Sequence, residues 1–530
     1  MLPTPGGTRN GRRATPVAPT DALFCAAADA LKSQNNPFSG GFGVQRLRPS
    51  SWLPLLLDAD DRYRLTGRLF LRLLALVYLA AFIASAIEIT GLVGENGILP
   101  AGEHLARLEQ QVGMLGWIRF PSLFWIDHSD TSLLLVSYAG CFFAITLLIG
   151  WRPLLSTIAL FILYLSLVRV GQLFFNFQWD YLLLEAGFLS IFLTAGPNRL
   201  LIFLFHWLLF RLRFLSGISK VLSEDPSWSS LTTLKYYFET QPLPHMGSWY
   251  AHQLPEWLLR TGTGFTLFVE IMVPFFIFLP RPFRLFAAFS TITIQVLIIL
   301  TSNHNFINLL TITLCLFLLD DRAIRGLIPK WLQSQPLQHP AGRISRFLLP
   351  PMAMILLVSS SFAIYDFVTD GRTENAWDAP VNWVRGWGLG NVYHVFPNMQ
   401  TERHELRIEG SQDGRTWKAY RFRYKPNGPE DRPRFIVPLH PRLDWMIWFV
   451  PPRSPLMRHW FESFLWRLHQ NSASVTALLA HNPFPEDGPR YLRVLSYRYR
   501  FTTPGEREET GRIWDAQYLG EFPNVPPRIP

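Results

Sequence analysis

The sequence predicts an α-helical polytopic membrane protein that carries a β-rich, sandwich-like domain at its C-terminal end. Two observations predict this fold. Charged residues make up 17% of the 530 residues, whereas a soluble domain has about 25%. In addition, charges and prolines are concentrated before residue 67 and after Asp366, and long apolar runs fill the middle. The chain therefore contains at least two domains of different physical character.

The middle of the chain holds the candidate membrane spans. A spanning helix needs about 20 mostly apolar residues. About nine runs meet or approach this length: Leu69–Thr90, Thr131–Ile149, Leu154–Phe174, Tyr181–Ala195, Leu200–Ser219, Phe265–Leu279, Phe283–Leu300, Phe306–Leu319 and Phe347–Tyr365. The fourth and eighth runs are short and could be buried or re-entrant segments, so we expect seven to nine spans.

The distribution of Lys and Arg predicts the orientation, because short cytoplasmic loops carry an excess of these residues. Arginines crowd the segment before the first run, whereas carboxylates outnumber them in the loop after it. Nine spans, or seven, then place the C-terminal domain outside the cytoplasm. The predicted organisation is a polar, partly disordered cytoplasmic segment at 1–66, a transmembrane domain at 67–366 and a non-cytoplasmic β-rich domain at 383–530.

The C-terminal domain shows the alternation of polar and apolar residues that is typical of half-buried strands. This pattern covers His404–Glu409, Trp417–Tyr424 and Leu495–Phe501. Between them, the segment Met457–Leu468 repeats apolar residues at helical spacing and predicts one amphipathic helix. We therefore expect a sandwich-like domain with helical insertions.

Several function classes lack support in the sequence. No P-loop, dinucleotide fingerprint, nucleophile elbow or zinc-protease motif is present, so we expect neither a cofactor nor a metal. The net charge of +10 comes largely with arginines that flank apolar runs, which argues against a nucleic-acid partner. The three cysteines form no CxxC motif, and no N-glycosylation acceptor occurs. These absences favour a bacterial inner membrane over an animal secretory membrane.

Ionisable residues within the apolar runs form a candidate polar site. Asp180 and Glu185 lie five residues apart in the fourth run, and the next run carries His206, Arg211, Arg213 and Lys220. An ionisable group in hydrocarbon costs at least about 2.5–3.5 kcal/mol, so such groups face the bundle interior and pair. We expect an acid to contact a base there. The pair is either structural or part of a functional polar cavity.

Aromatic and charged residues outside the runs form a second candidate set. Trp249, Tyr250 and His252 lie in the long segment 223–260, and the C-terminal domain contributes Arg442, Asp444, Trp445 and Trp448. The first three could belong to an interfacial aromatic belt or to a binding surface. The other four could form a core with a satisfied Arg–Asp pair or a contact patch, since Trp and Arg dominate interface hot spots. We expect both groups to form one client-facing surface.

Long strings spread over most of the chain from about residue 60 onward carry a family resemblance. They are Phe177–Gly187 (FQWDYLLLEAG), Trp207–Trp228 (WLLFRLRFLSGISKVLSEDPSW), Tyr236–Leu254 (YYFETQPLPHMGSWYAHQL), Thr401–Tyr424, Pro441–Phe449 (PRLDWMIWF), Ala480–Phe484 (AHNPF) and Tyr497–Glu506 (YRYRFTTPGE). With these strings the chain resembles the lipase maturation factor family.

The resemblance implies a membrane-embedded, chaperone-like folding factor that acts by binding rather than catalysis. Eukaryotic members reside in the endoplasmic reticulum membrane and help exported lipases reach their active form. The implied partners are an exported client, a lipase by resemblance, and membrane lipids. The alternative is a membrane enzyme or lipid-handling protein with a polar intramembrane site, loosely similar to the vitamin K-dependent carboxylase-like group.

Overall fold

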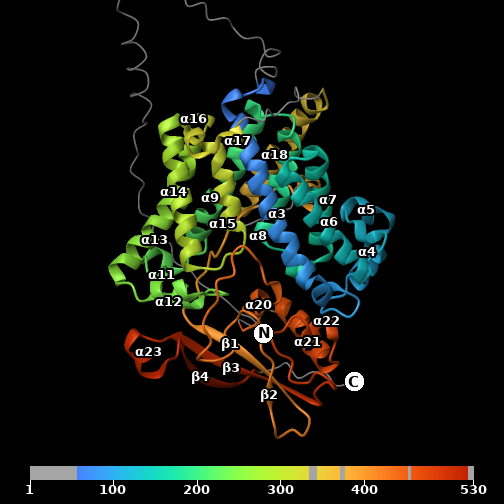
Figure 1. The fold of residues 1–530 in the computed structure, drawn as a ribbon, viewed down its shortest axis with the longest axis vertical. Coiled ribbons are helices and arrows are strands. Elements are labelled where there is room, and N and C mark those ends of the chain that lie inside the picture. Colours follow the sequence, from blue (N-terminus) through green and yellow to red (C-terminus); the bar gives the residue numbers. More distant parts are fainter. Residues whose placement is uncertain (1–55, 334–342, 370–375, 452–454, 523–530) are drawn as a thin grey trace, which may run out of the picture. The chain divides into compact units, whose positions relative to one another are not determined.

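A computed structural model describes residues 56–333, 343–369, 376–451 and 455–522. Most of the predicted N-terminal segment 1–66 lies outside these residues. The chain from Pro54 onward forms one compact unit. Its described part consists of a helical body and a smaller domain built on an antiparallel sheet (Figure 1).

Seven helices in the described residues are long and apolar enough to cross a membrane. They are α3 (Arg64–Val93), α6 (Asp130–Ile149), α7 (Pro153–Val170), α9 (Arg199–Leu222), α13 (Glu256–Ile271), α14 (Arg281–Thr301) and α18 (Arg343–Val368). The 3₁₀ segment Val273–Phe278 extends α13. The chain is therefore a polytopic membrane protein, as the apolar runs predicted.

The two short predicted runs form helices that other helices surround. These are α8 (Gln178–Leu193) and α15 (Ile307–Cys315), and most of their residues are buried. The outermost spans differ: only a third of the apolar window is buried in α13, α14 and residues 347–368. Phe283, Phe286 and Phe289 on α14 are exposed. An outward apolar surface of this extent fits contact with hydrocarbon rather than water.

Local sequence signals fix where the helices begin and end. The side chain of Asn198 accepts a hydrogen bond from the backbone N–H of Leu201 and so caps α9. Gly150 ends α6 in the left-handed region at φ +82°. Pro153 then starts α7, where its missing N–H is not needed.

Shorter helices connect the spans. Between α3 and α6 these include α4 (Ala101–Val112) and α5 (Gly116–Arg119), and between α9 and α13 they are α10 (Pro226–Ser229), α11 (Thr233–Thr240) and α12 (Met246–His252). The others are α16 (Asp321–Ile324), α17 (Lys330–Gln333) and α19 (Asp378–Gly386). Helices α10, α11 and α12 make up much of the segment 223–260, which was predicted to contribute to a client-facing surface.

The C-terminal domain contains one four-stranded sheet in the order β2-β1-β3-β4, with every neighbouring pair antiparallel. The strands are β1 (Arg403–Ser411), β2 (Lys418–Ala419), β3 (Tyr491–Phe501) and β4 (Trp514–Glu521), accompanied by α20 (Arg442–Ile447), α21 (Pro455–His469), α22 (Ala473–Thr476) and α23 (Pro504–Thr510). The described residues thus give one sheet, not the two layers of a sandwich.

Two features explain the difference from a sandwich. The predicted strand Trp417–Tyr424 is shortened to β2, because the side chain of Asn427 bonds to the backbone N–H and C=O of Phe422. The predicted amphipathic helix appears as α21, and its residues Trp460, Phe464 and Leu468 are fully buried. This helix packs near Phe422 and supplies apolar surface that a second sheet would otherwise provide.

Candidate functional site

The first predicted carboxylate, Asp180, forms a bidentate ion pair with Arg442 of the C-terminal domain. The two guanidinium nitrogens lie 3.0 and 2.8 Å from its carboxylate oxygens, and the hydroxyl of Tyr164 donates to the same carboxylate at 2.5 Å. Arg442 also donates to the carbonyl of Phe174 at 2.5 Å and lies 3.5 Å from the ring centre of Phe175. Both charged groups are completely buried.

This pair ties the helical body to the C-terminal domain. Burial alone would lower the pKa of Arg442, but the Asp180 carboxylate outweighs burial and holds that pKa above its ordinary value. The bidentate hydrogen bonds between the two groups offset part of the cost of burying their charges. Asp444, two residues later, does not pair with Arg442 but accepts the backbone N–H groups of Tyr424 and Lys425.

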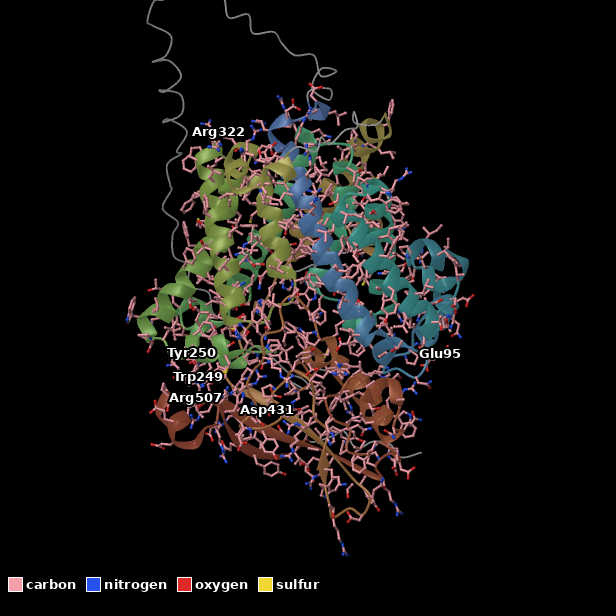
Figure 2. All side chains as sticks on the ribbon, viewed as in Figure 1. Glu95, Trp249, Tyr250, Arg322, Asp431 and Arg507 are labelled. Atoms are coloured by element: carbon pink, nitrogen blue, oxygen red, sulfur yellow. The ribbon has the colours of Figure 1, made fainter. Side chains whose placement is uncertain are left out.

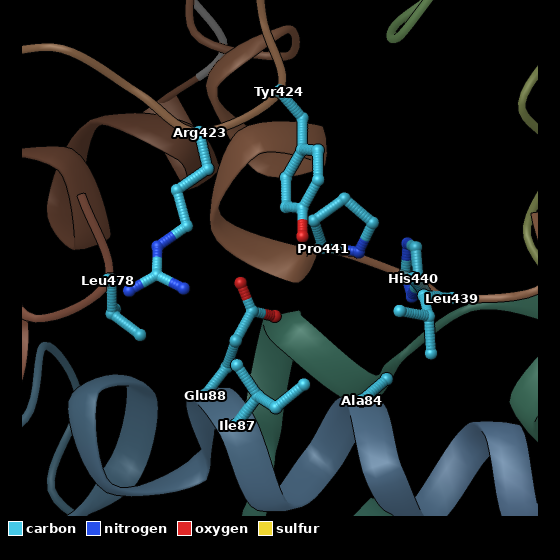
Figure 3. Close-up of a pocket in the computed structure, with 9 residues that line it drawn as sticks. All are labelled: Ala84, Ile87, Glu88, Arg423, Tyr424, Leu439, His440, Pro441 and Leu478. Atoms are coloured by element: carbon cyan, nitrogen blue, oxygen red, sulfur yellow. The ribbon is translucent and has the colours of Figure 1, made fainter. Parts of the chain in front are cut away.

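A third buried acid, Glu88 of α3, lies at the same junction. It accepts the backbone N–H of Arg442 at 2.6 Å. Figure 3 shows its carboxylate between Arg423, Tyr424 and Pro441, at a small cavity of about 20 Å³. Glu88 was not predicted as a site residue, although its place as an ionisable residue inside the first apolar run is a signal for one.

The second predicted carboxylate, Glu185, forms a separate cluster. It pairs with the guanidinium of Arg211 and accepts the hydroxyl of Tyr393 at 2.7 Å and the backbone N–H of Gly390 at 3.0 Å. Arg211 also donates to the carbonyl of Asn391 at 3.1 Å. Glu185 thereby anchors the segment that connects the last span to the C-terminal domain.

The remaining predicted bases lie at a third place. Nζ of Lys220 lies 2.7 Å from one carboxylate oxygen of Glu270, and Nη2 of Arg213 lies 3.3 Å from the other. Glu270 belongs to α13 and was not among the predicted site residues, although it lies in the sixth apolar run. These three residues line a cavity of about 100 Å³ together with Tyr237 and His304.

The predicted polar cluster is therefore three clusters rather than one. His206 belongs to none of them, since its ring bonds to the carbonyl of Phe317 at 2.7 Å. The carboxylates of Asp180 and Glu185 are enclosed by their hydrogen-bond partners. Of the three clusters, the one at Glu270 therefore has a cavity with room for a ligand. Among the described residues, no group of three or more His, Cys, Asp and Glu side chains could hold a metal ion.

The segment 223–260 packs directly against the C-terminal domain. The indole of Trp249 donates to the carbonyl of Thr502 at 3.0 Å. Arg403 of β1 donates to the carbonyls of Glu239, Gln241 and Pro242, and Trp448 donates to the carbonyl of Thr240 at 2.7 Å. The expected contact between this segment and the domain is confirmed. The contact itself uses residues that were expected to face a client.

The candidate client contacts differ in how far their side chains are exposed. Trp249, Trp445, Arg442 and Asp444 are all at most 4% exposed, so their side chains are not available to a partner in this structure. The C-terminal domain covers Trp249, whereas the helical body covers Arg442 and Trp445 at Asp180 and Trp179. His252 and Trp448 are partly buried. Tyr250 is 59% exposed, and it lies beside Trp249 and Arg507 where α12 faces α23 (Figure 2).

Comparison with known proteins agrees with this architecture. Residues 65–326 match the model for the lipase maturation factor transmembrane domain, and residues 389–524 match the one for the lipase maturation factor C-terminal domain. The chain is 31% identical to lipase maturation factor 2 of Xenopus laevis over 87% of its own length and 82% of the relative's. It is also 31% identical to lipase maturation factor 1 of Mus musculus over 86% of each.

No solved structure matches this chain. Both domain matches fall on the parts that the buried clusters join, and the sequence strings that carried the resemblance lie within them. The matches run in the same order along the chain and cover most of it. The chain belongs to the lipase maturation factor family, whose members are membrane proteins named for the maturation of lipases.

Proposed function

We propose that this protein binds an exported lipase during its folding and releases it once the lipase has buried its own apolar surface. Family membership supports a role in maturation. In addition, the segment 223–260 packs against the C-terminal domain through buried residues such as Trp249. Tyr250, the next residue, stays exposed at the edge of this contact. That exposed residue on a rigid frame is the observation that carries the proposal, because aromatic side chains on such frames make strong contacts.

The client-facing surface, as proposed, is formed by α12 and its flanks together with α23. Leu254 and Trp257 follow Tyr250 and are 42% and 68% exposed. The guanidinium of Arg507 on α23 lies 6.0 Å from the ring centre of Tyr250. A surface that combines aromatic, aliphatic and cationic groups can bind a partly folded protein, because such contacts do not require a particular sequence in the client.

The experiment compares two exposed tyrosines in cells that lack the native protein and express an exported lipase. Tyr250→Ala should leave the abundance of the membrane protein normal and lower secreted lipase activity several-fold. Tyr491→Ala is the matched control: Tyr491 is also exposed, but it starts β3, about 33 Å along the strand from Phe501. Equal lipase activity with both variants would contradict the proposal for this surface.

We also propose that the C-terminal domain lies outside the cytoplasm. Several arginine-bearing turns meet at one end of the helical body: Asp321 accepts the N–H groups that begin α3, and Arg281 pairs with Asp320. Because these arginines lie at one end of the helical body, they support a cytoplasmic location for that end. A reporter that is active only in the cytoplasm, fused after Pro530, should stay inactive. An active fusion would reverse this orientation.

A further inference from the structure

The cavity beside Glu270 is enclosed by several helices and by the segment that leads to the C-terminal domain. Its polar end is lined by Arg213, Lys220 and Glu270, and most of its remaining lining comes from apolar and aromatic side chains such as Trp228, Ile298 and Phe396. With a volume of about 100 Å³, it exceeds the space of a single water, whose share of the liquid is about 30 Å³.

The charges at the polar end do not balance. Arg213 and Lys220 are two cations, and Glu270 is the one carboxylate among the lining residues of this cavity. The other titratable groups there are neutral: His304 bonds to the hydroxyl of Tyr237 at 2.6 Å. Burial and the nearby charge of Lys220 also hold the pKa of His304 far below its ordinary value. One positive charge is thus left without a counter-charge in a buried site.

Hydrogen-bond donors are in excess as well. Nζ of Lys220 donates to the carbonyls of Ser216 and Val395 and lies 2.7 Å from a carboxylate oxygen of Glu270. Among the described residues, however, Nε of Arg213 and Nδ2 of Asn308 have no acceptor, although these two residues are only 5% and 2% exposed. Buried donors normally find a partner. Both residues line the cavity, so an acceptor-bearing ligand would satisfy them.

The partly exposed part of the lining shows how a ligand would enter. Thr266 on α13 and Ile298 on α14 are both partly exposed, as are Leu234 on α11 and Met399 in the segment that leads to the C-terminal domain. Helices α13 and α14 present most of their apolar surface outward, so a ligand that passes between them comes from the hydrocarbon. We infer that this cavity binds the anionic oxygen headgroup of a membrane amphiphile, whose apolar chain remains between α13 and α14 or in the bilayer.

The test measures binding of radiolabelled oleate to the full-length protein in phosphatidylcholine nanodiscs, corrected for empty nanodiscs. Oleate should bind at least tenfold more tightly than oleyl alcohol, which has the same chain without the charge. Phosphatidylglycerol and inorganic phosphate serve as competitors. Competition by phosphatidylglycerol would identify a phospholipid source, and its absence a fatty-acid source; either supports the inference. Binding of inorganic phosphate without binding of oleate or phosphatidylglycerol would overturn it.

Variants make the charge argument specific. Lys220→Met removes the excess cation and should weaken oleate binding at least tenfold, whereas Glu270→Gln adds net positive charge and should tighten it. Arg281→Gln changes the charge equally at the far end of α14 and should have no effect. Effects of the same sign for Lys220→Met and Glu270→Gln would overturn the inference. If a variant fails to fold, the comparison of oleate with oleyl alcohol in the unaltered protein still decides.

Discussion

At the scale of single residues, buried ion pairs stand within a mainly apolar interior. Asp180 with Arg442 joins elements far apart in the chain, whereas Glu185 with Arg211 joins the consecutive helices α8 and α9, and Glu270 with Lys220 joins α13 and α9. The sequence predicted that the acids in the apolar runs would be paired, because bare charge in hydrocarbon is unfavourable. It could not name the partner of Asp180, because no local pattern links two residues 262 positions apart.

Asp180→Asn should destabilise the protein strongly. The substitution leaves the buried guanidinium of Arg442 without its counter-charge, and breaking a buried pair in this way costs about 3–5 kcal/mol. We expect lower abundance and a lower unfolding temperature in detergent. Arg260→Ala, which removes an exposed pair with Glu256, should change neither. A normal unfolding temperature for Asp180→Asn would contradict the structural role of the pair.

His304 should make stability depend on pH. In the folded protein, burial and the charge of Lys220 lower its pKa from 6.5 to about 3. Below about pH 6.5 the unfolded chain therefore binds a proton that the folded protein does not, and stability falls as pH falls. His304→Gln should make the decline in free energy of unfolding between about pH 6.5 and 4 less steep. Unchanged pH slopes in denaturant titrations would contradict this.

At the scale of elements, the sequence predicted the long spans and the strands β1 and β3 well, because each depends on a local pattern of apolar residues. It overestimated β2 and expected a second sheet. In that region the side chains of Asn427 and Asp444 bond to backbone groups that a strand would pair. The sequence left open whether Trp249 and Trp445 are core or contact residues for a related reason: alternation and composition do not reveal which parts of the chain cover a given side chain.

The enclosure of α15 gives a test with cysteines. Cys315 on α15 is completely buried, whereas Cys141 on α6 is only partly buried. In a Cys25→Ser background, a membrane-permeant maleimide should modify Cys141 in the folded protein and leave Cys315 unmodified, as read by mass spectrometry. Both should react after denaturation. Rapid modification of Cys315 in the folded state would show that α15 faces lipid or water.

At the scale of the whole unit, the helical body and the C-terminal domain should unfold together. Arg442, Arg403 and Tyr393 all have their hydrogen-bond partners in the body. A fragment of residues 389–524 expressed alone should therefore aggregate or bind the dye ANS, because it loses these partners and exposes apolar surface. A monomeric fragment with a sharp unfolding transition would contradict this coupling. The full-length protein in the same buffer with detergent is the control.

The pairing of Asp180 with Arg442 also determines when the helical body can complete its assembly during synthesis. Residue 442 leaves the ribosome 262 residues after its partner, which at about 5–20 residues per second takes roughly 15–50 s. Throughout that interval the nascent α8 holds a carboxylate with no guanidinium to meet it. Final burial of α8 therefore waits until residue 442 has left the ribosome. Membrane insertion and assembly of the helical body are separate events in time, and a chain that stops before residue 442 stays unfinished within the bilayer.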